Sequence, residues 1–267
     1  MAKVHKKIVI MGATSGIGLR LAVTLASKGW TVGAAGRKLA VLEKLKSKFP
    51  TVVEIEQIDI KEKDAPKKLI RLIRKLGGMD IYFHDSGVGY ENVSLEIAEE
   101  VNTLETNVVG FARMIATAYH YYRLTGFHGQ IAAITSVAGT KGYGPLASYS
   151  SSKKFGQTYL WALDQLARQE GVDVAFTDIR PGWVRTPLLE NSRNYPMCLN
   201  MNQVVRSIIR ALLHETRVKT IDWRWNILSK IWDFIPYCMW VNMSPSVSSP
   251  ASPSQEKKNA KMSADKF

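Results

Sequence analysis

The chain has 267 residues, of which 46% are hydrophobic and 22% are charged, and it carries a formal net charge of +13. The length is compatible with one large α/β domain, and the only two cysteines, Cys198 and Cys238, argue against a disulfide framework or a structural zinc site. The charge fits a solvated basic surface or attraction to anionic substrates, cofactor phosphates or anionic lipid, whereas dispersed basic residues without a recognised motif argue against nucleic-acid binding.

Short apolar runs alternate with longer segments of helical period along most of the chain. We expect strands at residues 7–11, 31–35, 52–58, 80–83, 130–134, 173–178 and 218–221, and helices at residues 16–28, 39–49, 65–76, 94–122, 147–169 and 201–213. This alternation predicts crossover units and a parallel sheet covered by helices on both faces, in one domain spanning residues 1–222. Residues 244–267 are rich in Ser, Pro and Lys, and we expect a disordered tail.

A glycine-rich segment follows the first expected strand and reads Gly12-Ala13-Thr14-Ser15-Gly16-Ile17-Gly18. Gly12 would make the turn, Gly16 would let the backbone approach a cofactor pyrophosphate, and Gly18 would allow close helix-to-strand packing. The free N–H groups and the dipole of the following helix would face the phosphates. The segment therefore predicts a dinucleotide site that includes Thr14, Ser15 and Ile17, and a glycine turn without a ligand is the alternative.

The second expected strand ends in Arg37 and Lys38, and no acidic residue occurs between positions 30 and 41. An NAD site would place an acid in this region, where it accepts a hydrogen bond from the ribose hydroxyl. Arg37 and Lys38 are instead suited to a 2′-phosphate, which Arg binds through a bidentate fork. We therefore predict NADP(H) in preference to NAD(H), and a solvated loop arginine is the alternative.

Asp59 and Ile60 follow the third expected strand and form a further candidate contact with the cofactor. Two interpretations of Asp59 are open. Its carboxylate would accept a hydrogen bond from the adenine amino group, or it would cap the helix that follows.

Tyr149 and Lys153 open the long helix at residues 147–169, and a spacing of four places both side chains on one helix face. A free tyrosine has a pKa of about 10, and a neighbouring cation such as the Lys153 ammonium lowers it. Ser136 follows the strand at residues 130–134, and strand ends face the ligand crevice of a parallel sheet. We therefore expect Ser136 to hydrogen-bond a substrate oxygen beside a tyrosine acid–base group.

In this combination, residues 7–186 resemble the classical short-chain dehydrogenase/reductase family. The resemblance implies a Rossmann-type doubly wound sheet, a dimer or tetramer, and a metal-free catalytic set of Asn107, Ser136, Tyr149 and Lys153. Tyr149 would exchange a proton with the substrate oxygen, Lys153 would lower the pKa of Tyr149 and bind the nicotinamide ribose, and Asn107 would hold a water. The family pattern further assigns the cofactor to Gly87, Pro181, Gly182 and Thr186.

One segment departs from the family pattern. Residues 84–87 read His84-Asp85-Ser86-Gly87, where the family usually carries Asn-Asn-Ala-Gly. Gly87 is kept, but an ionised Asp85 accepts hydrogen bonds and cannot donate them. Either Asp85 makes part of the same structural hydrogen bonds, or His84 and Asp85 tune cofactor binding.

The region after Pro181 and Gly182 usually shapes the substrate pocket in this family. The resemblance implies a substrate lid over about residues 185–214, and the apolar residues here predict an apolar or lipid-like small-molecule substrate; they are Leu188, Leu189, Tyr195, Pro196, Met197 and Leu199. Trp183 is a further candidate for the pocket. Plain core packing is the alternative.

Residues 223–243 form an amphipathic segment that holds four tryptophans together with Arg224 and Lys230. Apolar residues recur in it at helical spacing. The segment 223–240 would lie in a membrane interface, or it would pack on the pocket or on a neighbouring subunit. The chain shows no transmembrane stretch and no signal peptide, so we expect a cytoplasmic protein and leave peripheral membrane contact open.

These observations predict an NADPH-dependent oxidoreductase that transfers hydride between the nicotinamide and a carbonyl or secondary alcohol of an apolar substrate. Two other functions remain as alternatives. One is a nucleotide-binding regulatory protein that keeps the fold without the chemistry, and the other is a scaffold at a membrane surface.

Overall fold

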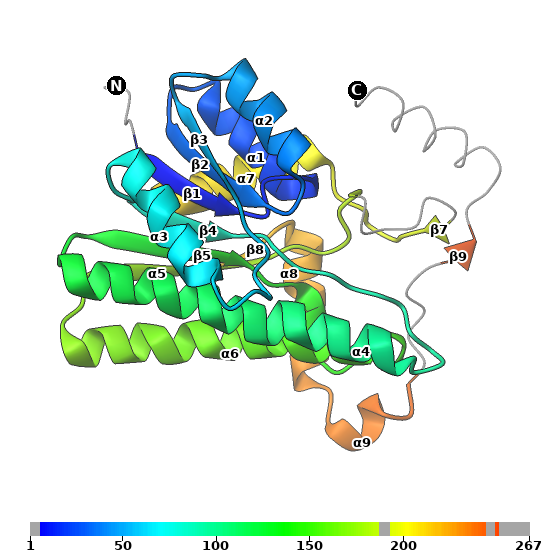
Figure 1. Ribbon diagram of the computed structural model, residues 1–267. Coiled ribbons are helices and arrows are strands. Elements are labelled where there is room, and N and C mark those ends of the chain that lie inside the picture. The colour runs from blue at the N-terminus through cyan, green and yellow to red at the C-terminus, as the bar shows by residue number, and fades with distance from the viewer. Residues whose placement is uncertain (1–5, 187–192, 244–248, 251–267) are drawn as a thin grey trace.

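The computed structural model describes residues 6–186, 193–243 and 249–250. Its sheet has seven parallel strands in the order β3-β2-β1-β4-β5-β6-β8, which confirms the predicted doubly wound α/β fold (Figure 1). The strands of this sheet are β1 (Lys7–Met11), β2 (Thr31–Gly36), β3 (Val53–Gln57), β4 (Ile81–His84), β5 (Gly129–Ile134), β6 (Val174–Arg180) and β8 (Val218–Thr220). The strand order reverses between β1 and β4, and in such sheets ligands bind at the carboxyl ends of the strands beside this point.

Helices cover both faces of the sheet. On one face lie α1 (Gly16–Ala26), α2 (Leu39–Lys48), α7 (Met201–Leu213) and α8 (Trp223–Phe234). On the other face lie α3 (Ala65–Leu76), α5 (Phe111–Thr125) and α6 (Ala147–Glu170). The short helices are α4 (Ile97–Leu104), which contacts α6, and α9 (Tyr237–Trp240), which follows α8 at the edge of the molecule (Figure 1).

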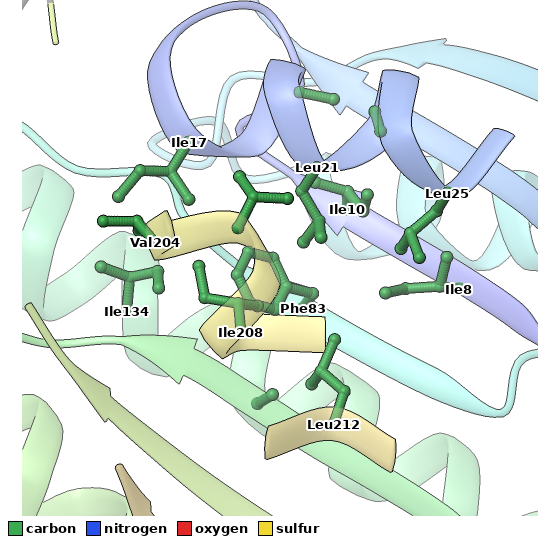
Figure 2. Close-up of a cluster of buried hydrophobic side chains, with 14 of the residues drawn as sticks. Ile8, Ile10, Ile17, Leu21, Leu25, Phe83, Ile134, Val204, Ile208 and Leu212 are labelled. Atoms are coloured by element: carbon green, nitrogen blue, oxygen red, sulfur yellow. The ribbon is translucent and has the colours of Figure 1, made fainter. Parts of the chain in front are cut away.

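The core beneath α1 and α7 explains why these segments fold as helices. Ile17, Leu21 and Leu25 of α1 lie four residues apart and are buried on one helix face. Val204, Ile208 and Leu212 of α7 show the same spacing, and both helices pack over Ile8, Ile10 and Phe83 of the sheet (Figure 2). Each fully buried aliphatic side chain contributes roughly 1.5–3 kcal/mol, so this interface holds the sheet and its loops in place.

The substrate lid expected over about residues 185–214 stays a prediction, and the structure describes part of this range. The second half of that range is α7, whose apolar face is part of the core and cannot open without exposing it. Residues 187–192, which include Leu188 and Leu189, lie outside the described residues. Within this range, the described residues that line the cleft precede α7.

The helix expected over residues 94–122 is divided into α4, a π-helical turn at Glu105–Gly110 and α5. It begins later than expected because Leu95 has a φ of +55°, outside helical geometry. The Asn92 side chain accepts a hydrogen bond from the Glu96 N–H at 2.8 Å and so fixes the turn before α4. Of the expected disordered tail, only Ser249–Pro250 belongs to the described residues, and it pairs as β9 with β7 (Arg193–Asn194).

Candidate active site

The glycine segment forms a tight loop between β1 and α1 at the carboxyl end of the sheet. Gly12 has a φ of +105°, and a β-carbon there would lie 2.8 Å from the Ser86 amide nitrogen. A β-carbon on Gly18 would overlap the Gly12 carbonyl oxygen. The N-cap residue Ser15 makes no side-chain hydrogen bond to the helix, so the Gly16 and Ile17 N–H groups at the start of α1 are available to an anion. This cradle fits the pyrophosphate of a dinucleotide.

Asp85 supports this loop from the neighbouring strand end. Its Oδ2 accepts a hydrogen bond from the Gly18 N–H at 2.6 Å, and its own N–H donates to the Met11 carbonyl at 2.7 Å. Burial raises the pKa of the Asp85 carboxyl to about 7, against the opposing effects of the Gly18 N–H and the Lys153 charge. These contacts favour the structural interpretation of Asp85, since the carboxyl ties β4 to the glycine loop.

His84 lies beneath the cleft and is fully buried. Its Nδ1 shares a hydrogen bond of 2.9 Å with the Tyr82 hydroxyl, and its ring packs edge-on against Phe111. Burial lowers the pKa of His84 to about 3, so the ring is neutral at physiological pH. Its contacts are therefore those of a core residue.

The difference in free energy of unfolding between an Asp85→Asn variant and the wild type is expected to shift in favour of the variant as pH rises. The folded-state pKa of Asp85, about 7, exceeds its usual value of 3.8, so the folded protein binds the proton more tightly. Wild-type stability therefore falls between about pH 4 and pH 7, by roughly 1.4 kcal/mol for each unit that separates the two pKa values. Urea unfolding at pH 5 and pH 7.5 measures this, with the exposed Asp233→Asn as the control. Parallel pH dependences of Asp85→Asn and the wild type would contradict it.

The adenosine end of the cleft is lined by Arg37, Asp59 and Ile60. The Arg37 side chain is exposed, and among the described residues no hydrogen bond or ion pair to its guanidinium is present. Asp59 Oδ1 accepts a hydrogen bond from the Lys61 N–H at 3.0 Å, whereas the N-cap of α3 is Asp64, so the capping interpretation of Asp59 is wrong. Lys38 lies at the N-cap of α2 and outside the cleft lining.

Tyr149, Ser136 and Lys153 meet at the centre of the same cleft, as the sequence predicts. The Ser136 hydroxyl hydrogen-bonds the Tyr149 phenol and lowers its pKa, but burial has the larger effect, and the pKa of Tyr149 is raised. Among the protein groups burial therefore outweighs any lowering, and the Lys153 ammonium, 5.6 Å from the centre of the tyrosine ring, remains the predicted cation beside the phenol. A β-carbon on Gly89 would lie 2.6 Å from that ring, so close backbone packing fixes the position of Tyr149.

Lys153 is buried between β5 and the loop after β4. Its Nζ donates to the Ile134 carbonyl at 3.1 Å and would lie 3.5 Å from a β-carbon on Gly87. Burial lowers the pKa of Lys153 to about 8, and the negative charges of Asp85 and Asp178 limit that decrease. Lys153 is thus held beside the loop after β4, and its contact with a ribose hydroxyl stays a prediction.

Asn107 lies in the π-helical turn and is buried behind Gly87 rather than on the cleft wall. Its Oδ1 accepts from the Val88 N–H at 2.9 Å, and its Nδ2 donates to the Val88 carbonyl at 2.7 Å and to the Ser152 hydroxyl at 3.1 Å. The side chain therefore joins the loop after β4 to α6. Its assignment as a water-binding residue stays a prediction.

The Pro181–Gly182 segment and Thr186 complete the nicotinamide end of the cleft. Thr186 approaches the glycine loop, since a β-carbon on Gly16 would lie 3.5 Å from its methyl group. A β-carbon on Gly182 would overlap the Trp225 indole ring. Trp225 is 3% exposed and donates from Nε1 to the Met197 carbonyl at 3.2 Å, so it supports both segments from behind.

The cleft has a volume of about 750 Å³ and extends from the glycine loop to a wall of aromatic and aliphatic side chains. This wall includes the predicted Trp183, Tyr195, Pro196 and Met197, whereas Leu199 is part of the core. It also includes Val88, Tyr90 and Leu146, which the sequence did not assign to the site. Trp225, Leu228, Trp232 and Trp240 of the segment 223–240 line it as well, and packing on the pocket was one of the open interpretations of that segment. For α8, the helical spacing of positions 225, 228 and 232 is the signal that would have found its inner face.

Comparison with known proteins agrees with this geometry. The model of the short chain dehydrogenase family matches residues 6–196, which include the glycine loop, Tyr149 and Lys153. The chain belongs to the short chain dehydrogenase family. It is accordingly an NAD(P)-dependent dehydrogenase or reductase, and Ser136, Tyr149 and Lys153 occupy the centre of its cleft.

Relatives of this short-chain dehydrogenase include an uncharacterized oxidoreductase of Myxococcus xanthus, 32% identical over 72% of this chain and 77% of the relative. A farnesol dehydrogenase of Aedes aegypti is 29% identical over 70% of this chain and 80% of the relative. Among solved structures, the short-chain dehydrogenase from Sphingobium yanoikuyae in complex with NADPH has a TM-score of 0.71 at 17% identity, covering 93% of this chain and 99% of that one. ElxO with NADP bound has a TM-score of 0.72 at 16% identity, covering 84% and 100%.

Proposed function

We propose that this short-chain dehydrogenase uses NADP(H) to interconvert a carbonyl and a secondary alcohol on an apolar, lipid-like small molecule. The observation that carries the cofactor preference is Arg37, which lines the adenosine end of the cleft where an NAD site would place an acid. Solved structures of similar fold that hold NADP or NADPH support the same preference.

In the reductive direction, a nicotinamide held by Lys153, Pro181–Gly182 and Thr186 would supply hydride to the carbonyl carbon. Tyr149 donates its phenolic proton to the carbonyl oxygen as the negative charge develops there, and Ser136 steadies that oxygen by a hydrogen bond. Lys153 holds its positive charge beside Tyr149 and stabilises the phenolate that remains. In the oxidative direction, the same groups remove the proton from the alcohol.

The far wall of the cleft indicates the class of substrate. This wall is formed by Trp225, Leu228 and Trp232 of α8, together with Trp183 and Met197. Removing this apolar surface from water lowers the free energy of the complex with an apolar substrate. Turnover of medium-chain apolar ketones or alcohols, with little turnover of short polar analogues, is the result that supports this class.

An Arg37→Ala variant is expected to lower kcat/KM for NADPH by roughly 10- to 100-fold, because a charge-assisted bidentate hydrogen bond contributes about 1.5–3 kcal/mol. The value for NADH should change by less than about threefold, since NADH has no 2′-phosphate. Steady-state kinetics with both cofactors measure this. Lys44→Ala removes an exposed positive charge from α2, outside the cleft lining, and serves as the control. Equal losses with both cofactors would contradict the role of Arg37.

A further inference from the structure

Helix α8 is apolar on two opposite faces. Its inner face carries Trp225, Leu228 and Trp232, which lie against the core and the cleft. This contact confirms the interpretation of the segment as a helix packed on the pocket. The inner face is therefore fully accounted for by the fold, and the outer face requires a separate explanation.

The outer face of α8 presents Trp223, Ile227, Ile231 and Phe234 at helical spacing. These side chains are exposed, Trp223 by 71% and Phe234 by 87%. The surface continues into α9 with Tyr237, which is 80% exposed. A helix that is apolar all round is normally buried, and single exposed apolar residues are common whereas contiguous groups mark interaction sites. The outer face of α8 together with Tyr237 is called the docking face below.

Charge distinguishes between the possible occupants of the docking face. Lys230 is exposed between Ile227 and Ile231, and Arg224 lies beside Trp223, where it pairs with Asp222 at 2.7 Å. The whole chain carries a net charge of +13, which attracts it to an anionic surface. Aromatic rings mixed with cations are typical of segments that lie at the headgroup level of a bilayer.

We propose that the docking face binds the surface of an anionic lipid bilayer. No helix within residues 6–186, 193–243 or 249–250 is long and apolar enough to cross a membrane, so the contact is peripheral. Because the opposite face of α8 lines the cleft, docking would place the substrate pocket next to the phase in which apolar substrates concentrate. The lipid contact itself does not depend on the proposed substrate or cofactor preference. Figure 1 shows α9 projecting at the edge of the molecule, beyond α6.

The test is flotation of the full chain with vesicles of equal parts phosphatidylcholine and phosphatidylserine, and with phosphatidylcholine alone. We expect the wild type to float with the anionic vesicles and to be released by high salt. The affinity of a Trp223→Ser/Ile231→Ser/Phe234→Ser variant for the anionic vesicles should be at least about tenfold lower, because three inserted apolar side chains are lost. The matched control is Leu124→Ser/Phe127→Ser, which changes side chains that are 86% and 69% exposed near the end of α5 and should float like the wild type.

Two results would overturn the proposal. One is a wild type that does not float with anionic vesicles, and the other is equal flotation of the wild type and the triple variant. Sedimentation velocity without vesicles tests a second copy as occupant: a smaller species for the triple variant, without lipid binding by the wild type, assigns the docking face to a subunit contact. Cofactor oxidation in detergent-free solution should be the same for the wild type and both variants, so a failure of the proposed activity is distinguishable from a failure of docking.

Discussion

Replacing Tyr149 with phenylalanine is expected to lower kcat by roughly 100- to 10,000-fold, the usual contribution of a positioned acid–base group. The variant keeps the ring that packs against the Gly89 backbone and loses only the phenolic oxygen that Ser136 contacts. Its fold and its affinity for the cofactor should therefore remain close to those of the wild type. Single-turnover rates with saturating cofactor measure the loss in the chemical step, and a fluorescence titration of the reduced cofactor measures binding.

Ser151→Ala supplies the matched control for this experiment. Ser151 lies on the same turn of α6, but its side chain is exposed and outside the cleft lining. Removing its hydroxyl should leave the rate within about twofold of the wild type, as for most exposed substitutions. Unchanged turnover of Tyr149→Phe across a range of ketones and alcohols would remove Tyr149 from the mechanism.

The central part of this site was predictable because its residues lie close together in the sequence or at the ends of neighbouring elements. Tyr149 and Lys153 are four residues apart on one helix, and the glycine loop joins a strand directly to a helix. Ser136 follows from the rule that strand ends of a parallel sheet meet at one edge. Each inference needs only the type and order of neighbouring elements, which the alternation of apolar runs reveals.

Other features depend on contacts between distant segments, and spacing does not report them. The pKa of Tyr149 was expected to fall beside Lys153, but among the protein groups burial of the tyrosine raises it, and the sequence does not specify the depth of that burial. An amphipathic pattern at residues 201–213 fits a lid and a core helix equally well, and the apolar face of this helix lies in the core. The start of α4 depends on the φ of Leu95, a non-glycine residue for which a positive value is uncommon.

Truncation of Trp225 should destabilise the protein, whereas truncation of Trp223, two positions earlier in α8, should not. Trp225→Ala is expected to lower the free energy of unfolding by about 3–5 kcal/mol, because it removes a buried indole and leaves a cavity behind Gly182. Trp223→Ala, at a position that is 71% exposed, should change stability by less than about 0.5 kcal/mol. Urea unfolding of both variants gives the comparison directly.

Trp225 also links the stability of the fold to the cofactor site. Its ring fills the space against Gly182, and its Nε1 holds the Met197 carbonyl of the pocket wall. A Trp225→Phe variant keeps an aromatic ring and loses this hydrogen bond, so it should fold and yet bind the cofactor more weakly than Trp223→Ala does. If both alanine variants unfold at the same urea concentration, Trp225 is not the support of this wall. If they differ as expected, one helix supports the cleft with its inner face and leaves its outer face free for the lipid contact.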